Sequence, residues 1–161
     1  MKIRIRWYGD CFKYIDKPVL ELKIKRGLLG KKIKYELQPF TLNNDFKAQN
    51  IIEIFKNSDI PEVISSELKL VNPVLLNRYQ RKYYLSADKK YRITIDTNQE
   101  FYRVGIQHNL FLNKMKNDTD TILELKYKQE YDNHANKITN YFPFRLSKIS
   151  KYVSGFEQVN L

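Results

Sequence analysis

Charged residues, mostly lysine and arginine, alternate with apolar residues in several predicted strands of this 161-residue chain. The alternation with apolar residues runs through residues 2–7, 19–25 and 31–37. Successive side chains of a strand point to opposite faces, so each of these strands has one basic and one apolar face. Guanidinium and ammonium groups are strong donors to phosphate oxygens. The pattern therefore predicts binding of a polyanion such as a chain of phosphates.

Bases outnumber acids on the expected polar strand faces. The bases are Arg4, Arg6, Lys23, Lys25, Lys32, Lys34, Arg81, Arg92, Lys126 and Lys128, and the acids are Glu21, Glu36, Asp96 and Glu124. For any one strand, a solvated face that discourages aggregation is an adequate explanation. Like charges gathered over many strands repel one another, however, and this repulsion destabilises an open solvated sheet. Together they favour a sheet curled around an anion.

Carboxylates among these bases are candidate ligands for Mg²⁺ or Mn²⁺, hard ions that prefer oxygen and bridge phosphates. Glu21 and Glu124 each begin a Glu-x-Lys-x-Lys pattern, in two predicted strands far apart in the chain. Glu21 is either a second metal ligand or a salt-bridge partner of Lys23 or Lys34, and the sequence leaves both open. Phosphoryl transfer depends mainly on positioning and charge neutralisation, so it requires no catalytic Cys or His.

Two helices and several hairpins are expected to position these side chains. Helical spacing of apolar residues marks residues 45–70, with Pro61 opening the second helix. A glycine-bearing hairpin is predicted at residues 26–30. Further strands are predicted over residues 74–86, 91–96, 100–104 and 121–131, with a turn at residues 96–98. A last helix is expected after Ser147 as N-cap and to end near Gly155.

The expected fold class is α+β: an antiparallel β-barrel, or tunnel, with helices packed outside. The apolar strand faces would point outward beneath the helices and the basic faces would line the interior, the inverse of an ordinary small barrel. No low-complexity linker divides the sequence, so residues 1–161 are predicted to form a single domain.

Composition excludes several classes of protein. A lone Cys11 rules out intramolecular disulfides and Cys-rich zinc sites, and only His108 and His134 are available for a His-rich site. The formal net charge is +11, which indicates an anionic partner. No apolar run is long enough to span a bilayer, and the first residues do not resemble a signal peptide. A cytoplasmic location is expected.

Several of these segments together resemble one family. The matching stretches are residues 3–9 (IRIRWYG), 20–25 (LELKIK), 31–34 (KKIK), 79–84 (YQRKYY), 91–96 (YRITID), 122–126 (ILELK) and 142–155 (FPFRLSKISKYVSG). In order and spacing the chain is similar to the VTC domain, the polyphosphate polymerase branch of the CYTH or triphosphate tunnel metalloenzyme superfamily. The resemblance covers nearly the whole chain.

The resemblance implies a tunnel that binds ATP with Mn²⁺ or Mg²⁺ and transfers the γ-phosphate to a growing polyphosphate chain. It implies triphosphate binding by Arg4, Arg6, Lys23, Arg81 and Arg92, with either Lys32 or Lys34. Glu124 would be the metal ligand, with Glu21 as the candidate second one. Lys25 and Lys126 belong with the ligand-binding bases, and Lys148 and Lys151 would lie on a helix at the tunnel end.

The sequence departs from the family in one respect. Members have several strands before the Arg-x-Arg strand, whereas Met1 lies almost directly on it. The tunnel is therefore expected to be incomplete at the N-terminus. Two alternatives remain: a triphosphate or phosphoryl hydrolase of the same superfamily, and a non-catalytic module that binds polyphosphate or, as the lesser candidate, nucleic acid. Whether a membrane-protein partner receives the product is left open.

Overall fold

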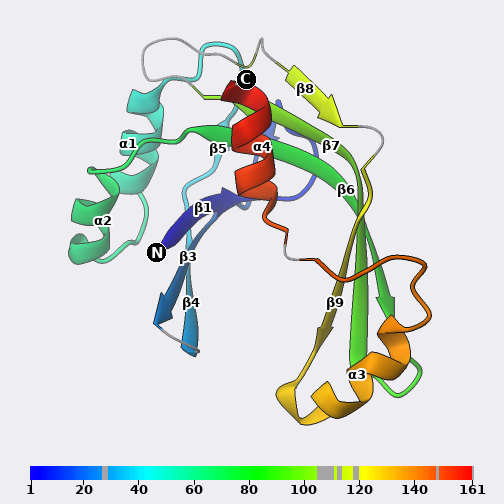
Figure 1. Ribbon diagram of the computed structural model, residues 1–161. Helices are drawn as coiled ribbons and strands as arrows, with labels where there is room; N and C mark the ends of the chain where they lie inside the picture. Colours follow the sequence, from blue (N-terminus) through cyan, green and yellow to red (C-terminus); the bar gives the residue numbers. More distant parts are fainter. Residues whose placement is uncertain (27–28, 105–110, 112–113, 118–119, 148, 161) are drawn as a thin grey trace. The chain divides into compact units, whose positions relative to one another are not determined.

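The computed structural model describes residues 1–26, 29–104, 111, 114–117, 120–147 and 149–160 (Figure 1). The chain divides into two compact units, which are described in turn. Unit 1 comprises Met1–Val74 and Val104–Phe111, and unit 2 comprises Leu75–Arg103 and Leu112–Leu161. The fold is mixed α+β with antiparallel sheets, as expected. The described strands close no sheet into a barrel, so the predicted tunnel is not confirmed.

The main sheet of unit 1 has the strand order β1–β3–β4, all antiparallel. Its strands are β1 (Lys2–Arg6), β3 (Val19–Arg26) and β4 (Leu29–Glu36). Arg26 lies directly opposite Leu29, which confirms the hairpin between β3 and β4. A separate short ladder pairs β2 (Tyr14–Ile15) with β5 (Phe40–Thr41), which the sequence did not indicate.

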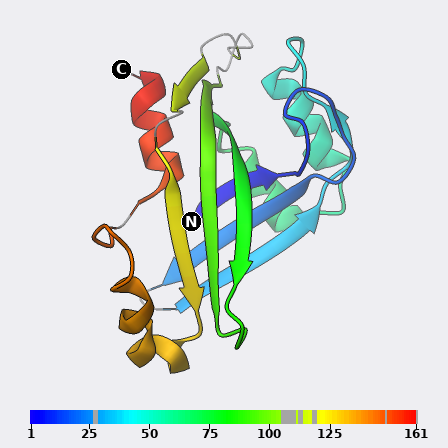
Figure 2. The same ribbon diagram turned by 90° about the vertical axis from the view of Figure 1, so that its right-hand side faces the viewer.

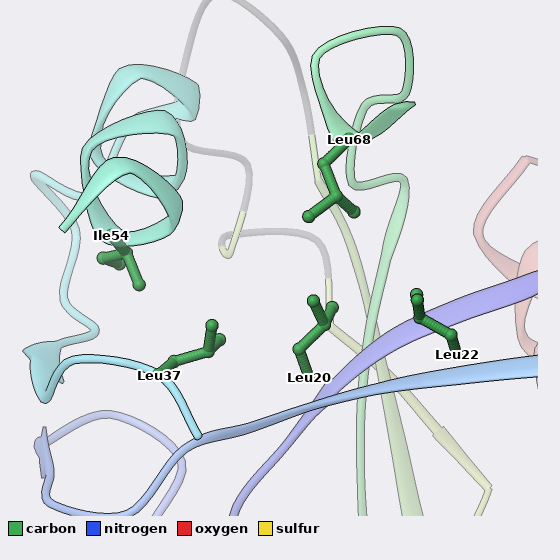
Figure 3. Close-up of a cluster of buried hydrophobic side chains, with 5 residues drawn as sticks. All are labelled: Leu20, Leu22, Leu37, Ile54 and Leu68. Carbon is green, nitrogen blue, oxygen red and sulfur yellow. The ribbon is translucent and has the colours of Figure 1, made fainter. Parts of the chain in front are cut away.

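Two helices cover the apolar face of this sheet, α1 (Ala48–Lys56) and α2 (Glu62–Leu68). Pro61 directly precedes α2, as predicted. Figure 3 shows the core that results: Leu20, Leu22 and Leu37 meet Ile54 of α1 and Leu68 of α2. Burial of these side chains is the main force holding helices to sheet. Because side chains alternate along a strand, the basic face of the sheet points away from this core.

Unit 2 is built around one long strand. Strand β7 (Tyr91–Arg103) pairs with β6 (Leu75–Leu85) along one edge. Along its other edge it pairs with β9 (Ile122–Tyr127) and then with β8 (Lys114–Asn117). Figure 2 shows β7 between β6 and β9.

The turn predicted at residues 96–98 is wrong, because β7 continues through it. The register shifts there, with Arg78 opposite Glu100 but Gln80 opposite Thr97, so β7 carries one extra residue. Asn98 has φ 52°, a left-handed conformation that asparagine tolerates. A β-bulge thus accommodates the turn-forming residues without ending the strand. One consequence is that Asp96 and Phe101 lie on the same face of the sheet.

Three short helices follow the sheet of unit 2: η1 (Gln129–Tyr131), α3 (Asp132–Thr139) and α4 (Lys151–Asn160). Helix α4 begins later than the sequence predicts. Ser150, not Ser147, directly precedes it, and the Ser150 hydroxyl accepts a bond from the Val153 N–H at 3.5 Å. Gly155 does not end the helix; it lies inside α4, buried against Phe101.

Candidate functional site

The basic face of unit 1 places like charges directly opposite one another. Lys2, Lys23 and Lys32 form one row across β1, β3 and β4. Directly opposite side chains on neighbouring strands have Cβ atoms about 5 Å apart, where like charges destabilise a sheet. Lys23 is exposed and has no ionic partner among the described side chains. Such a row favours occupation by an anion.

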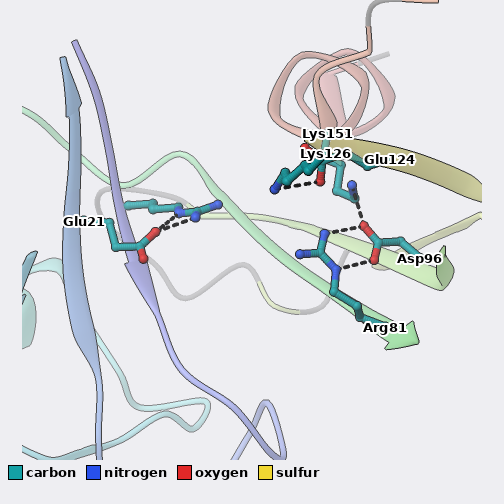
Figure 4. A network of polar contacts seen from close by, with 7 residues as sticks. Glu21, Arg81, Asp96, Glu124, Lys126 and Lys151 are labelled. Carbon is teal, nitrogen blue, oxygen red and sulfur yellow. Dashed lines mark hydrogen bonds and ion pairs between the residues drawn. The ribbon is translucent and has the colours of Figure 1, made fainter. Parts of the chain in front are cut away.

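A buried carboxylate occupies the next row. Glu21 is only 2% exposed and lies directly opposite Arg4. The Arg4 Nε donates to Glu21 Oε2 at 2.6 Å, and Nη2 pairs with the same oxygen. Lys32 Nζ lies 2.6 Å from Oε1, and Arg6 Nη1 lies 3.5 Å from it. One carboxylate therefore gathers three cations, as Figure 4 shows in part.

These contacts decide how Glu21 is charged. Burial on its own raises the pKa of the Glu21 carboxyl, but hydrogen bonds from Lys32 and Arg4 and the charges of Arg4 and Arg6 outweigh it, so the pKa is lowered. Glu21 is thus an anion at neutral pH with both oxygens facing cations. That favours a salt-bridge role over metal ligation, although the partners are not the lysines that the sequence suggested.

Unit 2 has a basic face of the same design on β6, β7 and β9. Arg92 lies directly opposite Lys126, a second like-charged pair. Arg81 lies directly opposite Asp96, and Thr94 directly opposite Glu124. The Thr94 hydroxyl is buried and has no hydrogen-bond partner in the described part of the chain.

Asp96 is the counterpart of Glu21 in unit 2. Its side chain is completely buried. Arg81 donates two hydrogen bonds to it, from Nε to Oδ1 at 2.5 Å and from Nη2 to Oδ2 at 2.6 Å. Lys151, the first residue of α4, places Nζ 2.6 Å from Oδ2 (Figure 4). Asp96 thus joins β6, β7 and α4.

Of the two candidate metal ligands, Glu124 is less enclosed by cations than Glu21. It is 42% exposed and its one described ionic contact is with Lys126 at 3.1 Å. The described residues contain no group of three or more His, Cys, Asp or Glu side chains able to hold a metal. Mg²⁺ is commonly bound by one or two carboxylates together with substrate phosphates. A single carboxylate such as Glu124 fits an ion of that kind, shared with a phosphorylated ligand.

The expected site residues fall into two sets, one on each basic face. Unit 1 holds Arg4, Arg6, Glu21, Lys23, Lys32 and Lys34, and unit 2 holds Arg81, Arg92, Glu124, Lys126 and Lys151. Lys32 and Lys34 share one face of β4, so both stay candidates for ligand binding. The side chain of Lys25 and all of Lys148 lie outside the described residues.

Sequence reasoning gave Lys2 and Asp96 no site role. Lys2 belongs to the alternating pattern of residues 2–7, and register alone puts it beside Lys23. In the sequence, Asp96 is distinguished only as an acid on a predicted polar strand face. The turn between β6 and β7 could have indicated its role. The Ser86 N–H donates to the Tyr91 carbonyl at 2.9 Å across this turn. Counting back along both strands from these residues places Asp96 directly opposite Arg81.

In a comparison with protein families, the model of the VTC domain matches residues 1–160. The chain belongs to the VTC domain family. No curated protein and no solved structure matches it. Membership implies a polyphosphate-related function at the level of the family. Within the described residues of this VTC domain, no helix is both long and apolar enough to cross a membrane.

Proposed function

We propose that this VTC domain is a polyphosphate polymerase-type phosphotransferase that uses ATP. The observation that carries the proposal is the strand register, which sets lysine against lysine in unit 1 and Arg92 against Lys126 in unit 2. An anion with closely spaced charges removes this repulsion, and a triphosphate or polyphosphate chain has such spacing. Family membership supports phosphate chains over other polyanions.

In the proposed reaction, a terminal oxygen of the growing chain attacks the γ-phosphorus of ATP. The bond between the γ-phosphorus and the β–γ bridging oxygen breaks, and the nucleoside diphosphate leaves with that oxygen. The protein's work is to hold both phosphate chains and to neutralise the charge that develops. Arg4, Arg6 and Lys23 of unit 1 and Arg81 and Arg92 of unit 2 are the proposed phosphate-binding groups.

Lys23→Ala is expected to weaken tripolyphosphate binding about tenfold and to leave the free protein as stable or slightly more stable. The first effect follows from the loss of a charged donor, and the second from relief of repulsion with Lys2 and Lys32. Calorimetric titration and urea denaturation measure the two effects. Lys31→Ala is the matched control, because Lys31 lies opposite Ile24 on the other face of the same sheet. Equal losses for both variants would contradict a phosphate site on this face.

Mn²⁺ or Mg²⁺ is the proposed cofactor, held by Glu124 together with phosphate oxygens. When bound, the ion would supply positive charge that offsets the charge of the phosphate oxygens. Glu124→Gln is expected to reduce the gain in ATP affinity on adding Mn²⁺ by about fivefold, while affinity in metal-free buffer is kept. Glu130→Gln changes an exposed carboxylate paired with Lys128 and serves as the control. An unchanged Mn²⁺ effect in Glu124→Gln would remove Glu124 from the proposal.

Product analysis separates the proposed polymerase from its alternatives. After incubation with ATP and Mn²⁺, electrophoresis showing long phosphate chains supports the polymerase. Orthophosphate or pyrophosphate alone indicates a hydrolase of the same superfamily. Tight binding of short polyphosphate with no turnover indicates a binding module. If labelled RNA displaces polyphosphate at moderate salt, the anionic partner is nucleic acid and the proposed function is wrong.

A further inference from the structure

Asp96 holds the arginine beside it in one orientation. Arg81 binds Asp96 through Nε and Nη2, so both bonds lie on one edge of the planar guanidinium. The ring centroids of Tyr79 and Tyr83 lie 5.0 Å and 5.9 Å from the Arg81 Cζ. These residues follow one another at every second position of β6 and therefore share a face. Arg81 is thus fixed along one edge and flanked by rings, while Asp96 does not use Nη1.

The same carboxylate also sets the position of Lys151. The Arg81 Nη2 and the Lys151 Nζ each lie 2.6 Å from Oδ2 of Asp96. The two cationic nitrogens are therefore no more than about 5 Å apart, close enough to reach oxygens of one phosphate group. Arg81 comes from β6 and Lys151 from α4, and Asp96 contacts both of them. The ring of Tyr79 also lies near both cations, with its centroid 5.3 Å from Lys151 Nζ.

Stability alone is a weak reason for this arrangement. Taking charges out of water is costly, and apolar residues of similar size often stabilise a protein at least as well as a buried ion pair. The cluster also stays cationic, because two positive groups share one carboxylate. Burial alone raises the pKa of Asp96, but the hydrogen bonds from Arg81 and Lys151 outweigh it and lower that pKa, so the carboxylate stays ionised at neutral pH.

We infer that Asp96 is a positioning residue that holds Arg81 and Lys151 in the orientation in which they bind one phosphate group of the phosphorylated ligand. The inference rests on the proposed function for its ligand and on the contacts of Asp96 for its geometry. The advantage is preorganisation: two long, flexible cations are ordered before the ligand arrives, so less entropy is lost on binding.

Asp96→Asn separates positioning from simple electrostatics, because the two predict opposite signs. Removing a negative charge beside an anion site strengthens binding if only net charge matters. If Asp96 positions the cations, Asp96→Asn weakens tripolyphosphate binding, by about tenfold, since the amide nitrogen cannot accept from the arginine. Glu100→Gln is the control: Glu100 also lies opposite an arginine, Arg78, on the same two strands but on the other face. It is expected to change affinity by less than about twofold.

A double-mutant cycle shows whether Asp96 acts through Arg81. In an Arg81→Gln background, Asp96→Asn is expected to cost less than about threefold in tripolyphosphate affinity, because the oriented group is already absent. A general loss of structure would instead lower affinity in both backgrounds equally. Equal or tighter binding by Asp96→Asn in the wild-type background, or the full loss in both backgrounds, overturns the inference.

A measurement without ligand on the wild-type domain tests the orientation itself and does not depend on the folding of Asp96→Asn. In the free wild-type domain, the Arg81 Nε–H resonance, assigned by its absence in Arg81→Gln, is expected to exchange with water more slowly than that of exposed Arg103. Exchange as fast as that of Arg103 overturns the inference. A protected Arg81 signal with no tripolyphosphate binding would instead overturn the proposed function and leave the orienting role of Asp96 standing.

Discussion

Glu21→Gln is expected to lower the free energy of unfolding by about 2 kcal/mol at neutral pH. The side chain keeps its size, so the loss comes from the charge. The neutral amide leaves Arg4, Arg6 and Lys32 without their shared counter-ion on a face that also carries Lys23. Removing one partner of a fully buried pair costs about 3–5 kcal/mol. The three cations are 32–49% exposed, so water screens part of the cost and the smaller figure applies.

Glu36→Gln is the matched control for this experiment. Glu36 lies on the same face, opposite Val19, but it is exposed. Its substitution is expected to change the free energy of unfolding by less than about 0.5 kcal/mol in urea denaturation. If Glu21→Gln is no more destabilising than Glu36→Gln, the three cations do not depend on Glu21.

The pH dependence of the same difference is a second check. The pKa of Glu21 is lowered in the folded state from its ordinary value of 4.5. Its stabilising effect is therefore complete above about pH 4.5 and is lost as the pH falls through the folded-state pKa. The difference in free energy of unfolding between wild type and Glu21→Gln is expected to be constant from neutral pH down to about pH 4.5. Below that pH the difference is expected to shrink and then vanish. A gap that persists in strong acid would mean that the charge of Glu21 is not its cause.

Gly155→Ala is expected to destabilise unit 2 by about 2 kcal/mol, against the usual preference of helices for alanine. A Cβ at this position would lie 2.6 Å from Cε1 of Phe101, closer still to its Cδ1, and 3.0 Å from Cδ2 of Leu75. Phe101 is 2% exposed and has no room to swing away. Either the core of unit 2 is strained or α4 lifts from β7, and both outcomes cost stability.

Val153→Ala is the control on the same helix. Val153 is 49% exposed, so this substitution is expected to change the free energy of unfolding by less than about 0.5 kcal/mol. Amide hydrogen exchange along α4 distinguishes strain from displacement, because a lifted helix loses its protection. If Gly155→Ala raises stability by the amount that helix propensity predicts, the close approach of α4 to β7 is absent in solution.

The two Glu-x-Lys-x-Lys segments show where sequence reasoning stops. They are nearly identical in sequence. The first lies wholly on β3 as predicted, whereas β9 ends at Tyr127 and leaves Lys128 of the second outside the strand. Glu21 is nevertheless buried beneath three cations, whereas Glu124 is half exposed beside Lys126. The difference comes from the neighbouring strands: Arg4 lies opposite Glu21, but Thr94 lies opposite Glu124. A strand's own residues do not specify its partners.

The sequence by itself determined which residues face together. Alternation with a period of two separates bases from apolar residues on any strand, and only an apolar face gains free energy beneath the helices that cover it. The basic faces, the hairpin at β3 and β4, the helices α1 and α2 and the family were therefore all predictable.

Tertiary structure decided the register, the bulge in β7 and the docking of α4. These features depend on contacts between residues distant in the chain, which no local pattern specifies. The contacts of Asp96 with Arg81 and Lys151 therefore follow only from the tertiary structure. The same holds for the packing of Gly155 against Phe101.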